Sequence, residues 1–235
     1  MVKANVRFEK TRPVERRAVP QDAAWTIGDG VVSGESSRLL YEPFCSCEAA
    51  ELHAVLTCLD AEMFHDNSDW SMEDTLAWID EPQRRDPREH RSIHQFGVRE
   101  RDTGACIGVA DVVYDPAVYR RDCVDFTSLG YLVDYRARNK GYGVEIVRSL
   151  VDLSFGHLKV DEIHASVDPE NASSLRVLQK AGLYVFRYLG ICADLRDHAR
   201  IVCALARDEW LEGRSISRSL VKEIGLFSPG WRPHP

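Results

Sequence analysis

The residues with the clearest chemical meaning in this chain lie together at positions 138–143. They read Arg138, Asn139, Lys140, Gly141, Tyr142 and Gly143. An apolar strand is expected just before this run and an amphipathic helix just after it, so several backbone N–H groups converge on one point. The positive end of the helix and two cationic side chains favour an anion there, and the glycines allow close approach to the main chain. The run predicts a turn that binds a pyrophosphate.

Three phosphate-binding patterns compete for this turn. A P-loop requires Gly-x-x-x-x-Gly-Lys-Ser/Thr, which the chain lacks. A dinucleotide-binding turn requires a third glycine three residues after Gly143, where the chain has Ile146. The pattern Arg/Gln-x-x-Gly-x-Gly/Ala remains, and it fits from Arg138 to Gly143.

A second motif follows downstream. Residues 161–167 are expected to form a strand, and a capped helix with Asn171 and Ser174 at its start closes at Gly182. With the turn, this order resembles the two motifs of the GNAT superfamily of N-acetyltransferases. The segment from Gly141 to Glu145 is similar to the branch that acetylates ribosomal-protein N-termini.

This resemblance implies an α+β fold of three layers, in which a mixed, mostly antiparallel sheet is splayed at its central strands and flanked by helices. It implies acetyl-CoA as the acyl donor. Main-chain groups of Leu132 and Val133 would then pair with the pantetheine. Amides of 139–143 would hold the pyrophosphate, supported by Arg138 and Lys140.

The resemblance also places Asn171 and Ser174 near the cofactor sulfur. Their simpler interpretation is structural, with Asn171 as the helix N-cap and Ser174 in the first turn. Many family members carry a tyrosine at the position of Leu178, where it protonates the leaving thiolate. Leu178 has no such group, so Ser174 or a water is expected to substitute.

The sequence does not decide which residue deprotonates the amine. Counting back from Val133 places the usual base position on Asp125, with Asp111 and Asp115 as rivals. Ser128 stands where the ribosomal-protein branch often has a glutamate. A desolvated amine that arrives neutral would need no base at all.

The elements that must position these residues follow from periodicity and turn residues. Strands are expected at 38–44, 92–100, 105–114, 123–133, 161–167, 183–191 and 198–205. Helices are expected at 48–62, 71–79, after Gly143, at 172–181 and in the tail around 217–224. Residues 25–32 are expected to form a hairpin that either lies against the domain or reaches a partner. These elements predict three parts: an N-terminal extension 1–37, an acetyltransferase domain 38–207 and a C-terminal tail 208–235.

Composition narrows the class of protein. The formal net charge of −7 argues against a nucleic-acid binder, which needs a basic face. A charged N-terminus and the lack of a long apolar stretch predict a cytoplasmic protein with no membrane partner. Seven scattered cysteines predict reduced thiols rather than a disulfide framework, and no metal site is expected.

The leading hypothesis is an acetyl-CoA-dependent N-acetyltransferase that acts on a primary amine of a small metabolite or antibiotic, or of a protein N-terminus. The aromatic and acidic loop 64–70 is expected either to hold a cationic amine or to bury Trp70 in the core. The alternative hypothesis is a catalytically inactive acyl-CoA-binding sensor or scaffold, motivated by the missing tyrosine. Transfer of a longer acyl group and a homodimer built on the tail also stay open.

Overall fold

The computed structural model describes residues 22–28, 31–57, 70–80, 92–114, 120–121, 124–189 and 200–211. Its strands are β1 (Ala23–Gly28), β2 (Val31–Ser36), β3 (Leu39–Glu42), β4 (Ser92–Glu100), β5 (Cys106–Tyr114), β6 (Arg120–Arg121), β7 (Val124–Val133), β8 (Glu162–Val167), β9 (Tyr184–Leu189) and β10 (Arg200–Ala206). Its α-helices are α1 (Ala49–Leu56), α2 (Met72–Asp80), α3 (Tyr142–Asp152), α4 (Ala172–Ala181) and α5 (Arg207–Leu211). Short 3-10 turns are η1 (Ser46–Glu48) and η4 (Tyr135–Ala137), and a π-helical turn, η5 (Leu153–His157), continues α3.

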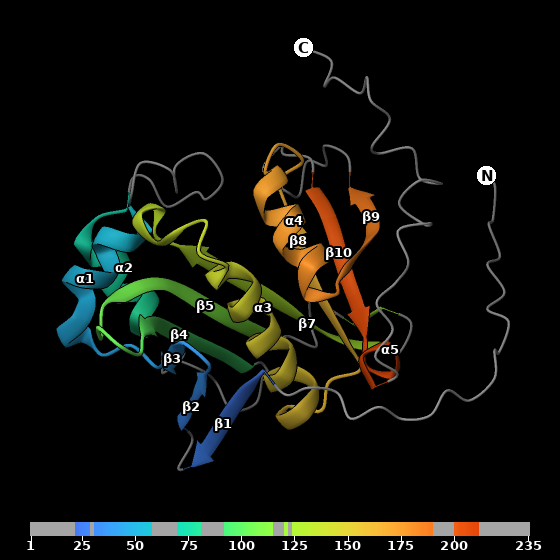
Figure 1. Cartoon of the computed structure of the whole chain (residues 1–235), viewed down its shortest axis with the longest axis horizontal. Helices are drawn as coiled ribbons and strands as arrows, with labels where there is room; N and C mark the ends of the chain where they lie inside the picture. The colour runs from blue at the N-terminus through green and yellow to red at the C-terminus, as the bar shows by residue number, and fades with distance from the viewer. Residues whose placement is uncertain are drawn as a thin grey trace, which may run out of the picture.

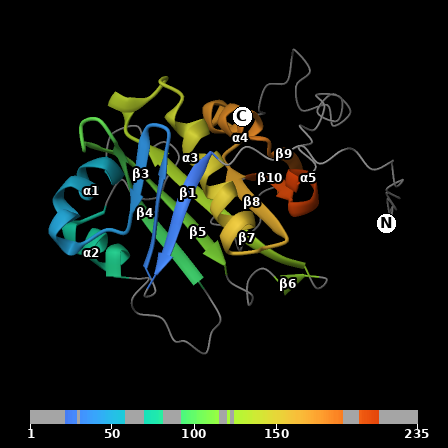
Figure 2. The ribbon, with the colours of Figure 1, turned by 60° about the horizontal axis from the view of Figure 1, so that its bottom comes forward.

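The strands form one mixed sheet in the order β1-β2-β3-β4-β5-β7-β8-β10-β9 (Figure 1). The pairing is antiparallel throughout this order except between β7 and β8, which run parallel. The short strand β6 pairs with the beginning of β7, away from the main path (Figure 2). This architecture confirms the predicted fold class.

Two apolar clusters hold helices on the two faces of the sheet. On one face, α3 and α4 pack on the larger cluster, which contains Phe96, Leu129, Ile146 and Leu178. On the other face, α1 and α2 pack on Val109, Leu132 and their neighbours. Successive strand residues point to opposite faces, so β5 and β7 contribute to both clusters.

The two central strands part from one another. β7 pairs with β8 only through Phe126, Thr127 and Ser128, whose partners are Glu162, Ile163 and His164. Beyond Ser128, β7 continues to Val133 along β5 alone. Figure 1 shows β9 and β10 turned away from β4 and β5. The predicted splay at the central strands is therefore present, and it leaves an open edge on β7 from Leu129 to Val133.

The N-terminal hairpin is an extension of the main sheet. β2 pairs with β3, so β1 becomes the edge strand. Trp25 is 8% exposed, contacts the rings of Tyr41 and Phe96, and donates from Nε1 to the Ser149 carbonyl at 3.0 Å. The hairpin was expected either to lie against the domain or to reach a partner, and in the structure it lies against the domain.

Most expected elements are confirmed with shifts of a few residues at their ends, whereas α5 was not foreseen. The expectation of reduced thiols is wrong for Cys45 and Cys47, which form a disulfide with Cα atoms 5.2 Å apart. The reason is local, since η1 folds the chain back between them and the Cys47 N–H points at Cys45 Sγ. The predicted tail helix at 217–224, residues 64–69 of the predicted loop 64–70 and Asp115 lie outside the described residues.

Candidate active site

The turn after β7 begins with a small helical cap. Asp134 is 2% exposed, and its Oδ1 accepts from the Arg136 backbone N–H at 2.8 Å, which starts η4. The Arg136 guanidinium binds the same carboxylate at 2.5 Å and holds the pKa of Asp134 below its usual value. The chain then turns through Asn139, whose φ is +62°, into Gly141, whose φ is +84°. Glycine adopts this left-handed conformation without the steric cost that a side chain would bring.

Gly141 is the N-cap of α3, so no side chain caps this helix. The first intrahelical bond is donated by the Glu145 N–H to the Gly141 carbonyl at 3.3 Å. The N–H groups of Tyr142, Gly143 and Val144 precede it and have no intrahelical acceptor. The predicted convergence of amides at the start of a helix is therefore present in the backbone, and it suits an anion.

Gly143 has a packing role that the sequence did not reveal. A Cβ at this position would lie 3.3 Å from Val177 Cγ2 and 3.5 Å from Tyr131 Cε2. The absent side chain therefore brings the start of α3 close to α4 and to the ring of Tyr131. The turn, α4 and the open edge of β7 meet at this point.

Four cationic side chains surround the turn, and each contacts a residue within it or beside it; Lys140 Nζ lies 5.9 Å from the centre of the Tyr142 ring. Arg136 binds Asp134, and Arg138 Nε donates to the Val133 carbonyl at 3.0 Å. Arg38, which the sequence analysis did not single out, binds Glu145 at 2.6 Å and donates to the Lys140 carbonyl at 2.9 Å. Its guanidinium also lies 4.4 Å from the centre of the Tyr142 ring. Arg38 thereby joins the segment before β3 to the turn at Lys140 and to the first residues of α3.

Val133 and Leu132 present their main-chain groups to different edges of β7. The carbonyl of Leu132 faces Gly108 of β5, where an added Cβ would collide with it. Main-chain groups of successive strand residues alternate between edges, so those of Val133 and Tyr131 face the open edge. The Val133 carbonyl accordingly accepts from Arg138 rather than from β5. Of the two predicted residues, Val133 is the one whose carbonyl faces the gap.

Two hydroxyl groups meet on the α3/α4 face of the gap. Tyr131 Oη lies 3.1 Å from Ser174 Oγ, and burial raises the pKa of Tyr131 to about 12, which keeps the phenol neutral. Asn171 caps α4 through its Oδ1, which accepts from the Ser174 N–H at 2.9 Å. Leu178 is 1% exposed within the core. Tyr131 is thus a hydroxyl donor that sequence reasoning missed, because its closeness to Ser174 depends on how α4 packs on β7.

The two described aspartates named as bases lie in different places. The backbone of Asp125 lies at the start of β7, paired with Arg120 and before the last β7/β8 pair at Ser128. Asp111 lies in β5 directly opposite Gly130, just beyond that pair. The register therefore brings Asp111, rather than Asp125, level with the opening of the gap.

The face of the sheet under α1 and α2 carries a row of aromatic side chains. Phe44, Trp78 and Trp70 form a row with ring centres 6.1 and 6.4 Å apart. All three are partly buried against the cluster under α1 and α2. The expected burial of Trp70 is therefore present, although the rest of its loop lies outside the described residues. His53 Nδ1 and Thr75 Oγ1, 2.8 Å apart, join α1 to α2 behind this row.

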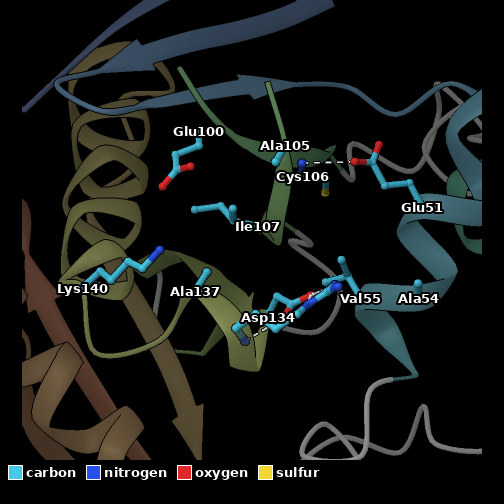
Figure 3. A pocket seen from close by; sticks show the side chains of 11 residues that line it. Glu51, Ala54, Val55, Glu100, Ala105, Cys106, Ile107, Asp134, Ala137 and Lys140 are labelled. Atoms are coloured by element: carbon cyan, nitrogen blue, oxygen red, sulfur yellow. Dashed lines mark hydrogen bonds and ion pairs between the residues drawn. The ribbon is translucent and has the colours of Figure 1, made fainter. Parts of the chain in front are cut away.

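A cavity of about 420 Å³ lies between α1 and the turn (Figure 3). Glu51 projects from α1, and its Oε1 accepts from the Cys106 N–H at 3.1 Å. Lys140 and Glu100 point toward one another across another side of the cavity. Hydrogen bonds from the hydroxyls of Tyr142 and Thr103 lower the pKa of Glu100, and the charges of Lys140 and Arg38 act in the same direction. This cavity is on the α1 side of the turn, whereas the gap between β7 and β8 is on the α4 side.

Within the described part of the chain, no three His, Cys, Asp or Glu side chains are grouped as metal ligands. The helices of that part include none that is long and apolar enough to cross a membrane.

Comparisons with known proteins identify one family of acetyltransferases. The profile of the acetyltransferase (GNAT) domain matches residues 38–184. The probable N-acetyltransferase YjcK of Bacillus subtilis (strain 168) is 41% identical over 64 residues, which are 27% of this chain and 35% of the relative. The uncharacterized protein YkkB of the same organism is 26% identical over 110 residues, 47% of this chain and 60% of the relative. The chain thus matches between about a third and three-fifths of the length of these curated relatives.

Solved structures agree in fold. A structure described as a putative ribosomal-protein-serine acetyltransferase from Vibrio cholerae has a TM-score of 0.57 at 21% identity, covering 73% of this chain and 95% of its own. The aminoglycoside acetyltransferase AAC(6')-Ib, in complex with ribostamycin and coenzyme A, has a TM-score of 0.60 at 17% identity. That match covers 78% of this chain and 100% of the other. At these identities the likeness establishes the arrangement of elements.

Proposed function

Because the chain belongs to the GNAT acetyltransferase family, we propose that it transfers an acetyl group from acetyl-CoA to the primary amine of a small cationic molecule. The observation that carries the proposal is the open edge of β7, from Leu129 to Val133, beside the uncapped start of α3. An extended pantetheine arm fits an unpaired strand edge, and a pyrophosphate fits a helix N-terminus. The two features meet at Gly143, so one ligand with both parts can bind them together.

Each residue around the gap has a role in this proposal. The N–H groups of the first turn of α3 bind the pyrophosphate, and Arg138 and Lys140 add positive charge. The main chain of Val133 pairs with the pantetheine, next to Leu132. Ser174, with Tyr131 behind it, donates a proton to the sulfur as the thioester breaks. Asn171 holds Ser174 in place by capping α4.

The Tyr131–Ser174 pair also bears on the hypothesis of an inactive binding module. That hypothesis depends on Leu178, which stands where many members of the family carry a tyrosine. Here the hydroxyls of Tyr131 and Ser174 lie 3.1 Å apart on the same side of the gap. A proton donor is available without a tyrosine in α4, which favours the enzyme.

The acceptor side favours a cationic amine of small size. Aromatic rings attract cations, and the partly buried rings of Trp70 and Trp78 lie on the α1/α2 face of the sheet. The aminoglycoside acetyltransferase that shares this arrangement of elements binds ribostamycin, a cationic amine. A protein N-terminus is the second candidate acceptor within the same reaction class.

The test is release of free thiol from acetyl-CoA in the presence of spermidine, kanamycin or a tetrapeptide with a free N-terminus. We expect turnover with a polycationic small molecule to exceed that with the peptide. Preference for the peptide would assign the protein-N-terminus branch instead. Absence of thiol release with every acceptor, hydroxylamine included, would refute the proposed function.

A further inference from the structure

The disulfide between Cys45 and Cys47 lies on the surface of the protein, in the connection from β3 to α1. Both cysteines and Ser46 between them are exposed. The free cysteines of the described chain, Cys106 and Cys203, are buried. A thiolate breaks a disulfide by direct attack on one of its sulfur atoms, so access decides which cysteines react. Among the cysteines that the structure describes, only this pair is therefore open to a thiol from solvent.

This bond adds little to the stability of the fold. The entropy that a disulfide removes from the unfolded chain grows with the length of the loop it closes, and these two cysteines are only two positions apart. The helix that follows is held by other contacts, because Leu52 and Val55 are buried in the cluster under α1 and α2. Glu48 also accepts from the Cys45 N–H at 3.0 Å and binds Arg99 of β4 at 2.6 Å. The bond can therefore be reduced while the domain stays folded.

The bond nevertheless fixes the backbone next to an aromatic contact of the core. Cys47 donates its N–H to Cys45 Sγ at 3.1 Å, so the two residues form a closed turn at the start of η1. Phe44 directly precedes this turn. Its ring fills the space over Gly97 of β4, where an added Cβ would lie 2.7 Å from Phe44 Cε1, and its centre is 6.1 Å from that of Trp78. Opening the turn frees the torsion angles at Cys45 and, with them, the position of Phe44.

From this arrangement we infer that Cys45 and Cys47 form a reversible exchange site for small thiols, and that the state of the bond sets how firmly Phe44 is held. A thiolate attacks one sulfur to give a mixed disulfide and one free cysteine thiolate, and a second thiol then releases the other cysteine. In total, two small thiols give up two electrons and two protons and become one disulfide. The protein disulfide takes them up and becomes two cysteine thiols. An oxidised small thiol reverses both steps.

The state of the bond also bears on the acceptor. Phe44 is the first ring of the row that continues through Trp78 to Trp70. In the proposed function this row lies on the acceptor side, and this part of the inference rests on that function. A loosened Phe44 disturbs the row and leaves the turn at 138–143 untouched. Reduction is therefore expected to weaken binding of the acceptor and not of acetyl-CoA.

The first experiment uses the whole chain without denaturant. The protein is equilibrated in reduced or oxidised glutathione, free thiols are blocked with iodoacetamide, and the peptides are analysed by mass spectrometry. We expect Cys45 and Cys47 to carry no label in oxidised glutathione and one label each in reduced glutathione, reversibly, while Cys106 and Cys203 stay unlabelled. Labelling of the pair in oxidised glutathione, or no labelling in reduced glutathione until urea is added, would overturn the inference.

The second experiment measures acetylation of the best acceptor among spermidine, kanamycin and the tetrapeptide. The product is quantified by mass spectrometry, because reductant interferes with thiol detection. An aromatic contact is worth a factor of about 2 to 10 in an equilibrium constant, so we expect reduction to raise the KM of the acceptor by about that factor, with the Kd of acetyl-CoA unchanged. The double variant Cys45→Ser with Cys47→Ser should have the raised KM and no response to reductant. The control Ser46→Ala keeps both thiols and should respond like the wild type.

An acceptor KM that is the same in both states would overturn the link through Phe44. A response to reductant that persists in the double variant would assign the effect to another cysteine and would also overturn it. Absence of acetylation by the wild type with every acceptor would refute the proposed function instead, and the labelling experiment would still decide whether the exchange site exists.

Discussion

The buried carboxylate of Asp152 gives a prediction whose size follows from the structure. Asp152 is 5% exposed at the end of α3, where its Oδ2 accepts from the backbone N–H groups of Asp22 and Ala23 at 2.6 and 3.1 Å. Burial raises its pKa from 3.8 to about 6, although these two hydrogen bonds act in the opposite direction. The folded protein therefore binds a proton there more tightly than the unfolded chain does.

Linkage turns this shift into a dependence of stability on pH. Between about pH 4 and pH 6 the folded state holds the proton and the unfolded state loses it, so the free energy of unfolding falls as pH rises. A shift of about two pKa units corresponds to about 3 kcal/mol at most. Asp152→Asn keeps an oxygen acceptor for the two N–H groups but never carries the charge.

Urea unfolding of the wild type and of Asp152→Asn at pH 4 and at pH 8 measures this contribution. We expect the variant to gain up to about 3 kcal/mol relative to the wild type between the two pH values. Taking the difference between the proteins cancels every other titrating group. An unchanged difference at the two pH values would show that Asp152 ionises normally in the fold and would refute the reasoning.

Three further predictions concern the hairpin, the hydroxyl pair and the turn. Trp25→Ala should lower the free energy of unfolding by about 3–5 kcal/mol, measured by urea denaturation, because a large side chain that is 8% exposed is removed; a loss below 1 kcal/mol would contradict docking of the hairpin. Tyr131→Phe should lower kcat without changing the Kd of acetyl-CoA, since it removes only the hydroxyl bonded to Ser174; a weaker Kd with an unchanged kcat would contradict this role. Arg38→Ala should weaken acetyl-CoA binding in calorimetry, because the Lys140 carbonyl loses its donor; unchanged affinity would show that the turn holds its shape without Arg38.

The central strands and the helices of the fold were predictable because their patterns are local. Alternating apolar residues identify β4, β5 and β7, and Gly182 ends α4 with a φ of +106°. The position of the N-terminal hairpin was not predictable, since it depends on Trp25 finding a site between Tyr41, Phe96 and α3. The disulfide of Cys45 and Cys47 depends on a turn that spacing alone does not specify.

The parts of the site that are contiguous in the sequence were predictable, whereas the contacts between separate strands and helices were not. The turn from Arg138 to Gly143 and the cap at Asn171 are contiguous motifs, and the structure gives both the expected backbone form. The neighbours that complete the site come from other strands: Asp111 over Gly130, Tyr131 beside Ser174, and Arg38 over Tyr142. Strand register and helix packing decide these pairs, and neither follows from residue spacing.

Acetyl-CoA binding to a blocked turn tests the central claim most directly. Titration calorimetry would compare the wild type with Gly143→Trp, whose side chain would fill the space between the start of α3, Val177 and Tyr131. Gly156→Trp is the matched control, because a Cβ there meets nothing within 4 Å. We expect the wild type and the control to bind acetyl-CoA with similar affinity, and Gly143→Trp to lose at least about 100-fold, or 2.7 kcal/mol. Unimpaired binding by a folded Gly143→Trp protein would contradict the claim that the donor lies at this turn.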